Sequence, residues 1–277
     1  MISRISIVCF AASYAVVLAM ELSRLLFRSG VRGAIMVGFA AAGLLAHTLY
    51  LAHRAAEALG PPLSSERDWC LVAAWLLVAF YLYLVYYHPQ KSFGVFLLPM
   101  ALGLIAAGRY LGDERPFARD PASQVWGAIH GTAFALTTVA VLVGFAAGLM
   151  YLRQARRLKL KLSPGRGLRL PSLEWLQRVN ARALVFSIIV LAVGVLSGAV
   201  LNLIRATDET GRLPWRDPLV LGSGTMLVWL AAAALWGRVW QPAAAGRKVA
   251  YLTLVSFVLL VGLVALLLLN TQHGGRG

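Results

Sequence analysis

The sequence predicts an all-α integral membrane protein, a bundle of about eight transmembrane helices with both termini outside, formed by residues 1–277 as one polytopic domain. Of the 277 residues, 60% are hydrophobic and 13% are charged, so one water-soluble core cannot cover the apolar surface. The apolar residues form separate runs of roughly 20 residues, the length of a helix that crosses a bilayer. The Lys and Arg residues gather in the short connections between these runs.

Each apolar run is expected to be a helix, because peptide groups in hydrocarbon must be hydrogen-bonded within their own segment. The eight runs cover residues 5–27, 33–53, 69–88, 91–111, 124–152, 180–205, 219–240 and 248–269. The first run is long enough to be a retained helix rather than a signal peptide, and it has Arg24, Arg28 and Arg32 at its far end. Glu21 and Arg24, three residues apart in this run, can pair.

The connection 153–179 sets the expected orientation. Against one acid, Glu174, it carries Arg153, Arg156, Arg157, Lys159, Lys161, Arg166, Arg169 and Arg178. Short basic loops stay in the cytoplasm, so we expect this loop to be cytoplasmic. Within it, helical spacing of Leu173, Trp175, Leu176 and Val179 indicates an amphipathic turn on the anionic leaflet or, alternatively, a docking site for a cytoplasmic partner.

Composition narrows the function classes. The net charge of +15 lies in short loops, so membrane topology explains it, and the expected partner is the lipid bilayer rather than nucleic acid. Cys9 and Cys70 do not form a Cys-x-x-Cys pair that would indicate a thiol relay. The sequence offers neither a mid-membrane acid for ion-coupled transport nor a nucleophile beside a base, so an ordinary enzyme is not expected.

The histidines indicate a cofactor. His130 begins the fifth run, His273 follows the eighth, His53 ends the second and His47 lies six residues deeper, all toward the outer side, whereas His88 is inner. Two neutral imidazoles from different helices can bind haem iron from opposite faces, so His130 and His273 are candidate axial ligands. The alternative for each is an interfacial histidine that needs no partner.

The outer loop 206–218 ends in Leu213-Pro214-Trp215-Arg216-Asp217-Pro218. Trp215 can stack on a porphyrin, and Arg212 or Arg216 can bind its propionates. Alternatively, Asp217 is the N-cap of the next helix, Pro218 suits its first turn, and Trp215 belongs to the interfacial aromatic belt.

From Trp126 to the C-terminus the chain resembles the cytochrome c assembly family of haem-handling membrane proteins, and its length and eight helices are similar to the HemX-type, CcsA-like members. In fuller family members a tryptophan-rich outer loop, the WWD motif, presents haem between two outward histidines. The resemblance implies that His130 and His273 correspond to those histidines, and Trp215, Asp217 and Pro218 to the end of the motif. The motif's other tryptophans and glycines are missing from residues 206–216. Leu219 and Val220 stand where the motif has Lys-Glu. His47 corresponds to a member of a deeper histidine pair.

The resulting hypothesis is a protein that binds and positions haem at the outer face of a bacterial inner (cytoplasmic) membrane for cytochrome c assembly. Other cytochrome c biogenesis membrane proteins would be its partners, and haem its cofactor. Two alternatives stay open: a HemX-type membrane regulator of a haem-biosynthesis enzyme that acts through the basic loop, and a small-solute permease.

Overall fold

A computed structural model describes residues 6–23, 31–57, 64–89, 91–113, 121–161, 168–205, 215–239 and 242–269. These residues form helices and turns without strands, which confirms the predicted all-α class. The helices are α1 (Ile7–Ser23), α2 (Val31–Glu57), α3 (Glu66–Tyr87), α4 (Gly94–Tyr110), α5 (Pro121–Lys159), α6 (Leu173–Arg205), α7 (Pro218–Val239) and α8 (Pro242–Leu269).

Six of these helices, α2, α3 and α5 to α8, are long and apolar enough to cross a membrane by length and composition. Helices α1 and α4 are apolar as well but have 17 residues each. That length lies at the lower end of the range of about 17–25 residues for a membrane helix. The chain is therefore a multi-pass membrane protein.

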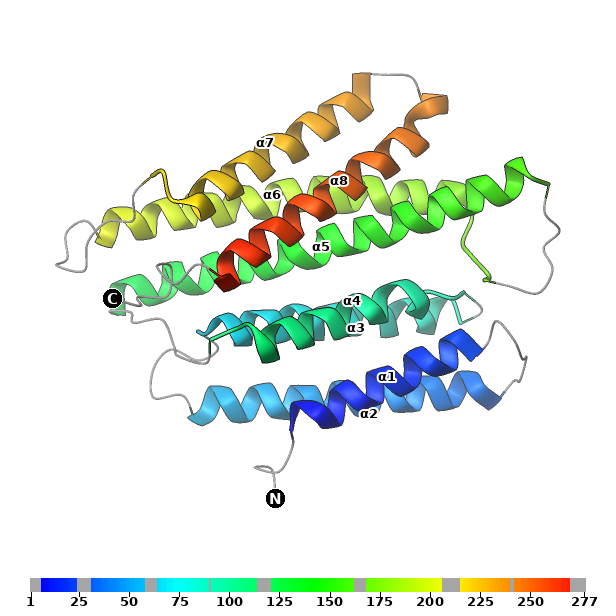
Figure 1. Cartoon of the computed structure of the whole chain (residues 1–277), viewed down its shortest axis with the longest axis horizontal. Helices are drawn as coiled ribbons and strands as arrows, with labels where there is room; N and C mark the ends of the chain where they lie inside the picture. Colours follow the sequence, from blue (N-terminus) through cyan, green and yellow to red (C-terminus); the bar gives the residue numbers. More distant parts are fainter. Residues whose placement is uncertain are drawn as a thin grey trace.

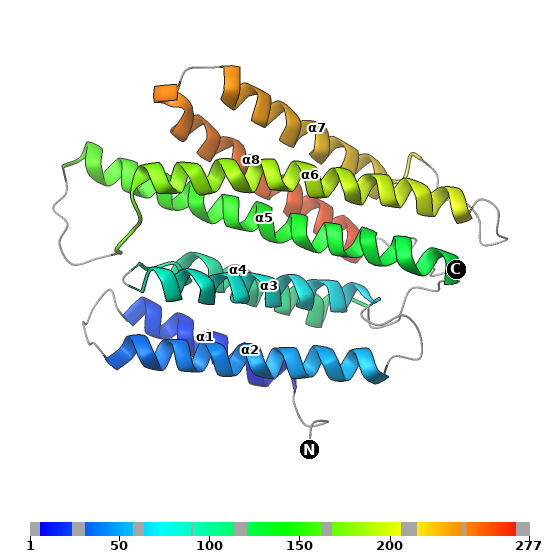
Figure 2. The ribbon, with the colours of Figure 1, turned by 180° about the vertical axis from the view of Figure 1, so that it is seen from behind.

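The helices run side by side and form three groups (Figures 1 and 2). The α1–α2 pair lies at one edge, α3 and α4 lie in the middle, and α5 to α8 form the other edge. Helix α5 is central, because it packs on α6 and α8 and also contacts α3 and α4. Helix α2 packs on α1 and α3, so it belongs to the opposite side of the bundle from α6 and α7.

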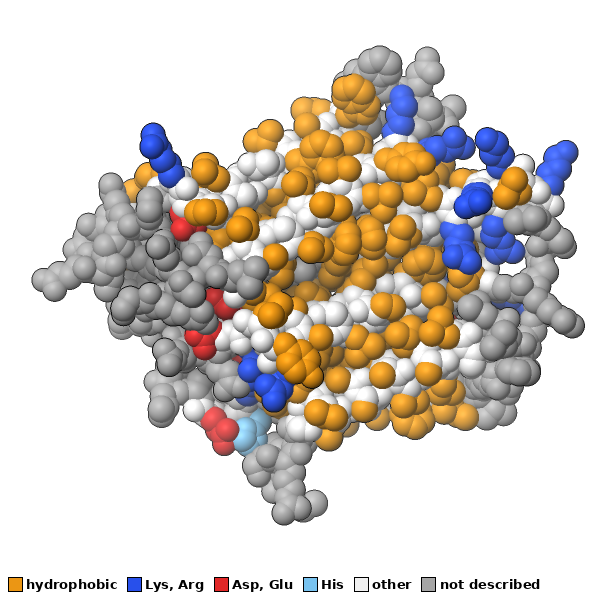
Figure 3. All heavy atoms as spheres, viewed as in Figure 1, with side chains coloured by type: hydrophobic (Ala, Val, Ile, Leu, Met, Phe, Trp, Pro, Cys, Tyr) orange, Lys and Arg blue, Asp and Glu red, His pale blue; other side chains and the backbone are white. Residues whose placement is uncertain are grey.

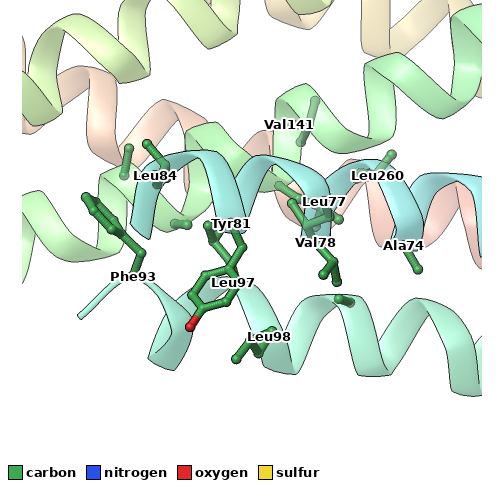
Figure 4. Close-up of a cluster of buried hydrophobic side chains, with 14 of the residues drawn as sticks. Ala74, Leu77, Val78, Tyr81, Leu84, Phe93, Leu97, Leu98, Val141 and Leu260 are labelled. Atoms are coloured by element: carbon green, nitrogen blue, oxygen red, sulfur yellow. The ribbon is translucent and has the colours of Figure 1, made fainter. Parts of the chain in front are cut away.

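Helix α3 contributes many of the buried side chains of the apolar core. Leu77 and Tyr81 of α3 and Leu97 and Leu98 of α4 are at most 2% exposed. Figure 4 shows α3 between α4 on one side and Val141 of α5 on the other. Many apolar side chains instead face outward, as expected where lipid is the solvent.

The two ends of the bundle differ in charge. We call the end with Arg153, Arg156, Lys159, Arg178 and Arg247 the basic end; these side chains are exposed. The opposite, acidic end holds Glu57, Glu66, Asp68, Asp113 and Asp217. On the face in Figure 3, the visible acids lie toward the left end, and Lys and Arg dominate the right end. This distribution matches the sidedness predicted from the loops, with the basic end expected in the cytoplasm.

Polar side chains tie α2, α3 and α4 together at the acidic end. Arg54 of α2 forms an ion pair with Asp68 of α3, with 2.6 Å between Nε and Oδ1. Asp68 also completes a capping box with Ser65, the N-cap of α3. Arg67 donates to the backbone oxygens of Gly108 (3.2 Å) and Arg109 (3.4 Å) of α4. These bonds satisfy peptide groups that the helix ends leave without partners.

The basic connection differs from its predicted form. Helix α5 continues to Lys159 and α6 begins at Leu173, so much of the predicted loop 153–179 is helical. The residues expected to form a separate interfacial turn are the first turns of α6. Leu176 is wholly buried, and the Trp175 ring lies 5.6 Å from Phe93 and 5.7 Å from His88 between centroids. The chain itself therefore covers this apolar face; residues 162–167 lie outside the described residues.

A short segment without regular secondary structure, residues 168–170, links α5 to the turn between α3 and α4 at the basic end. Each of its three carbonyl groups accepts a hydrogen bond from a different residue. Arg157 Nη1 donates to Leu168 (2.8 Å), the Ser92 amide donates to Arg169 (3.1 Å), and Lys91 Nζ donates to Leu170 (3.3 Å). This segment therefore connects α5 with the turn between α3 and α4.

Glu21 has a partner on α3 that was not predicted from the sequence. Its side chain is wholly buried, and Tyr81 of α3 donates a hydrogen bond to its Oε1 at 3.2 Å. Gly94, which begins α4, leaves room for this carboxyl group, because a Cβ there would lie 2.7 Å from Glu21 Cγ. Arg24, the expected partner, lies outside the described residues.

Thiol labelling tests the orientation. In a chain with Cys9→Ser and Cys70→Ala, Leu158→Cys probes the basic end and Tyr110→Cys the acidic end; the native side chains are 60% and 81% exposed. In intact cells, a membrane-impermeant maleimide should label Tyr110→Cys only, and permeabilised cells should show labelling of both. Labelling of Leu158→Cys in intact cells would contradict the predicted orientation.

The α3–α5 contact depends on a glycine. A Cβ on Gly131 of α5 would overlap the ring of Trp69 of α3. We expect Gly131→Ala to lower the free energy of unfolding by about 1–3 kcal/mol through overpacking. The matched control is Gly38→Ala in α2, where a Cβ meets nothing within 4 Å. Thermal unfolding in detergent should show a lower midpoint for Gly131→Ala than for Gly38→Ala, and equal midpoints would show that Trp69 moves without cost.

Candidate functional site

His130 lies on α5 at its contact with α6, near the acidic end. Two glycines of α6, four residues apart, make room for it. A Cβ on Gly198 would lie 2.8 Å from His130 Cε1, and a Cβ on Gly194 would lie 3.0 Å from the ring of Phe134. The His130 and Phe134 rings, one helical turn apart, contact each other at 4.7 Å between centroids. This Gly-x-x-x-Gly spacing, typical of close helix packing in membranes, is the signal that the sequence analysis did not use.

A backbone carbonyl fixes the protonation of the His130 ring. Nδ1 lies 2.8 Å from the carbonyl oxygen of Gly194, and a carbonyl oxygen can only accept. Nδ1 therefore carries the proton of the neutral imidazole, and Nε2 carries the lone pair. Histidines that bind metals commonly donate their other ring nitrogen to a carbonyl or carboxylate in this way.

The turn before α7 contains the second group of predicted residues. Asp217 is 4% exposed, and its Oδ1 accepts from the Leu219 amide at 2.8 Å, while its carbonyl accepts from the Leu221 amide at 3.0 Å. Asp217 therefore acts as the N-cap of α7, and Pro218 occupies the first helical position. Trp215 is 54% exposed and Arg216 is exposed, so these two side chains are accessible at this end.

The four-helix group α5 to α8 brings these residues to one end of the bundle. Helix α5 begins, α6 ends, α7 begins and α8 ends at the acidic end (Figure 1). Helix α6 packs on α5, α7 and α8, which links the His130 contact with the Trp215 turn. Helix α8 ends at Leu269, and His273 lies outside the described residues, so the second predicted axial ligand is not located.

His47 belongs to a different part of the bundle. It is wholly buried between α1 and α2, where Phe10 stacks on its ring at 4.0 Å and Tyr14 Oη lies 3.3 Å from its Nδ1. Its Nε2 is buried without a hydrogen-bond partner in the described part of the chain. Because α3 and α4 separate α2 from α5 and α6, His47 and His130 do not share a site.

The remaining histidines have local partners. His53 Nδ1 lies 2.9 Å from Glu57 Oε2, one turn further along α2. His88, exposed at the basic end, contacts the Trp175 ring edge-on. Neither lies in the α5–α8 group.

A large apolar hollow has none of the four described histidines in its lining. This lateral groove has a volume of about 590 Å³ and is lined by α4, α5 and α8. Its lining includes Phe96, Pro99 and Gly103 of α4, Phe145 of α5 and Phe257 of α8, and Thr138 is its polar lining residue. The volume is in the range of small-molecule sites, about 300–1,000 Å³.

Comparisons of this chain with protein-family models, with curated proteins and with solved structures found no match.

The cap of α7 can be tested without haem. Asp217→Ala removes the acceptor for the Leu219 amide, and we expect it to lower the free energy of unfolding by about 1 kcal/mol. Asp217→Asn retains a capping oxygen and should stay within a few tenths of a kcal/mol of the parent. Thermal unfolding in detergent measures both, and equal losses in the two variants would show that the charge of Asp217, rather than its cap, stabilises the turn.

Proposed function

We propose that this chain is a haem-handling membrane protein of the cytochrome c assembly type, with His130 as one axial ligand at the acidic end. One observation carries the proposal: the Gly194 carbonyl binds the His130 Nδ1 proton and thereby makes Nε2 the basic nitrogen of the ring. A helix-packing histidine of this kind has the tautomer that an iron ligand needs.

Two further side chains support this assignment. Trp215 presents an exposed indole and Arg216 an exposed guanidinium in the turn capped by Asp217. An indole can stack on a porphyrin face, and a guanidinium can bind a propionate through two hydrogen bonds. The resemblance to the family rests on these residues together with His130 and His273.

The role of the chain in this proposal is binding and orientation. Haem would supply the iron and the vinyl groups that react with cysteine thiols of the apocytochrome, and His130, Trp215 and Arg216 would hold it at the membrane surface. The bond-forming step would belong to a partner, consistent with the expectation that other cytochrome c biogenesis proteins accompany this one.

Visible spectroscopy of the purified protein tests the proposal. Haem added to the parent in detergent should give the Soret band of histidine-ligated haem, and His130→Ala should shift it and lower haem affinity at least tenfold. Imidazole added to His130→Ala should restore the parental band, which shows that the variant is folded. His88→Ala, at the other end, is the matched control. A Soret band that is the same in the parent and in His130→Ala would exclude His130 as a ligand.

A further inference from the structure

We propose that the lateral groove and two arginines beyond it bind one anionic glycerophospholipid from the leaflet at the basic end. An acyl chain would lie between α4, α5 and α8, and the phosphate would lie against Arg153 and Arg156. This site is separate from His130, because none of the four described histidines lines the groove.

The groove exists because α4 and α8 stand apart. Both lie on the same side of the bundle in Figures 1 and 2. Helix α4 packs mainly on α1 and α3, whereas α8 packs on α5, α6 and α7. Helix α5 forms the floor between them, and the stacked rings of Phe145 and Phe257, 3.9 Å apart, close the α5–α8 seam.

Two residues of α4 make the groove hollow. Pro99 and Gly103 line it one turn apart, and a Cβ on Gly103 would meet nothing within 4 Å. From Val95 to Leu111, α4 and its C-cap residue contribute about 24 Å of groove wall at 1.5 Å per residue. That length exceeds half of the hydrocarbon core, which is about 30 Å thick, so an acyl chain from one leaflet fits along it.

The floor of the groove leads to positive charge. Phe145 and Leu149 line the groove, and Arg153 and Arg156 follow at spacings of four and three residues, on the same face of α5. Both arginines are exposed. Figure 3 shows Lys and Arg side chains beyond the apolar surface at the end where α5 projects.

In the described part of the chain, neither acid of the basic end pairs with Arg153 or Arg156. Glu174 of α6 pairs with Arg178, with 3.7 Å between Oε1 and Nη2, and Glu21 is buried against Tyr81. A ligand that matches both parts must combine a long hydrocarbon chain with a negative headgroup. An anionic glycerophospholipid has both. Such lipids are present in the cytoplasmic leaflet, whose negative charge attracts basic juxtamembrane residues. An acidic protein would use the arginines without filling the groove.

The experiment measures lipid binding by the full-length protein in nanodiscs, with spin-labelled phosphatidylglycerol and spin-labelled phosphatidylcholine as probes. The parent should prefer phosphatidylglycerol. The double variant Arg153→Gln/Arg156→Gln should lose roughly 30-fold in phosphatidylglycerol affinity, about fivefold per charge. The matched control Arg178→Gln/Arg182→Gln removes the same charge from exposed positions of α6.

A second pair of variants tests the groove itself. Gly103→Phe places a ring in the open space of the groove, and Gly38→Phe makes the same change on α2, where a Cβ also meets nothing within 4 Å. We expect Gly103→Phe to weaken the binding of both lipids at least fivefold and Gly38→Phe to leave it unchanged. Equal thermal unfolding midpoints for the two variants confirm that both are folded.

Three results would overturn the lipid site. Equal losses in the two arginine pairs would mean that phosphatidylglycerol senses only the overall charge of the basic end. Parental binding by Gly103→Phe would mean that no chain enters the groove. Effective competition by soluble glycerol 3-phosphate would mean that a headgroup-sized anion is bound without a chain. His130→Ala should leave lipid binding unchanged, so failure of the haem proposal and failure of this one are distinguishable.

Discussion

Every peptide group in the hydrocarbon of a membrane must find its hydrogen-bond partner inside the protein, and the architecture of this chain depends on that constraint. It forces the apolar runs into helices and moves the groups left over at helix ends to the two surfaces. Polar side chains gather there for the same reason. Asp68 and Ser65 cap α3, Asp217 caps α7, and Arg67 binds the last carbonyls of α4. Trp215 and Arg216, which we propose contact haem, immediately precede Asp217, the N-cap of α7.

Small residues explain both the histidine contact and the groove. Where a helix carries glycine and a neighbour supplies a ring, the ring fills the space: His130 lies against Gly198, and Trp69 lies against Gly131. Where glycine and proline face a gap between helices instead, the space stays hollow, as at Gly103 and Pro99. A membrane offers little hydrophobic drive for helix association, so packing of this kind decides which helices meet.

The sequence predicted the helical segments well, because hydropathy over a span is a strong signal. It did not predict the ends of α5 and α6, since α5 continues beyond residue 152 and α6 begins before residue 180, with polar and basic residues that hydropathy assigns to a loop. At the candidate site, the capping role of Asp217 followed from its place before Pro218. The hydrogen bonds between His130 and the Gly194 carbonyl and between Tyr81 and Glu21 could not be predicted from the sequence, because both depend on which helices are neighbours. Those contacts join residues 60 or more positions apart.

The hydrogen bonds of residues 168–170 have a consequence for how the two halves of the chain hold together. The halves α1 to α4 and α5 to α8 are joined covalently by the connection between α4 and α5 at the acidic end. At the opposite end, the Ser92 amide and Lys91 Nζ donate hydrogen bonds to the carbonyls of Arg169 and Leu170, across the two halves. Within the second half, Arg157 donates to the carbonyl of Leu168. The two halves are thus joined by the chain at the acidic end and by hydrogen bonds at the basic end. Separating the halves at this end would break the two hydrogen bonds from Ser92 and Lys91, so the turn between α3 and α4 and residues 168–170 should move as one unit.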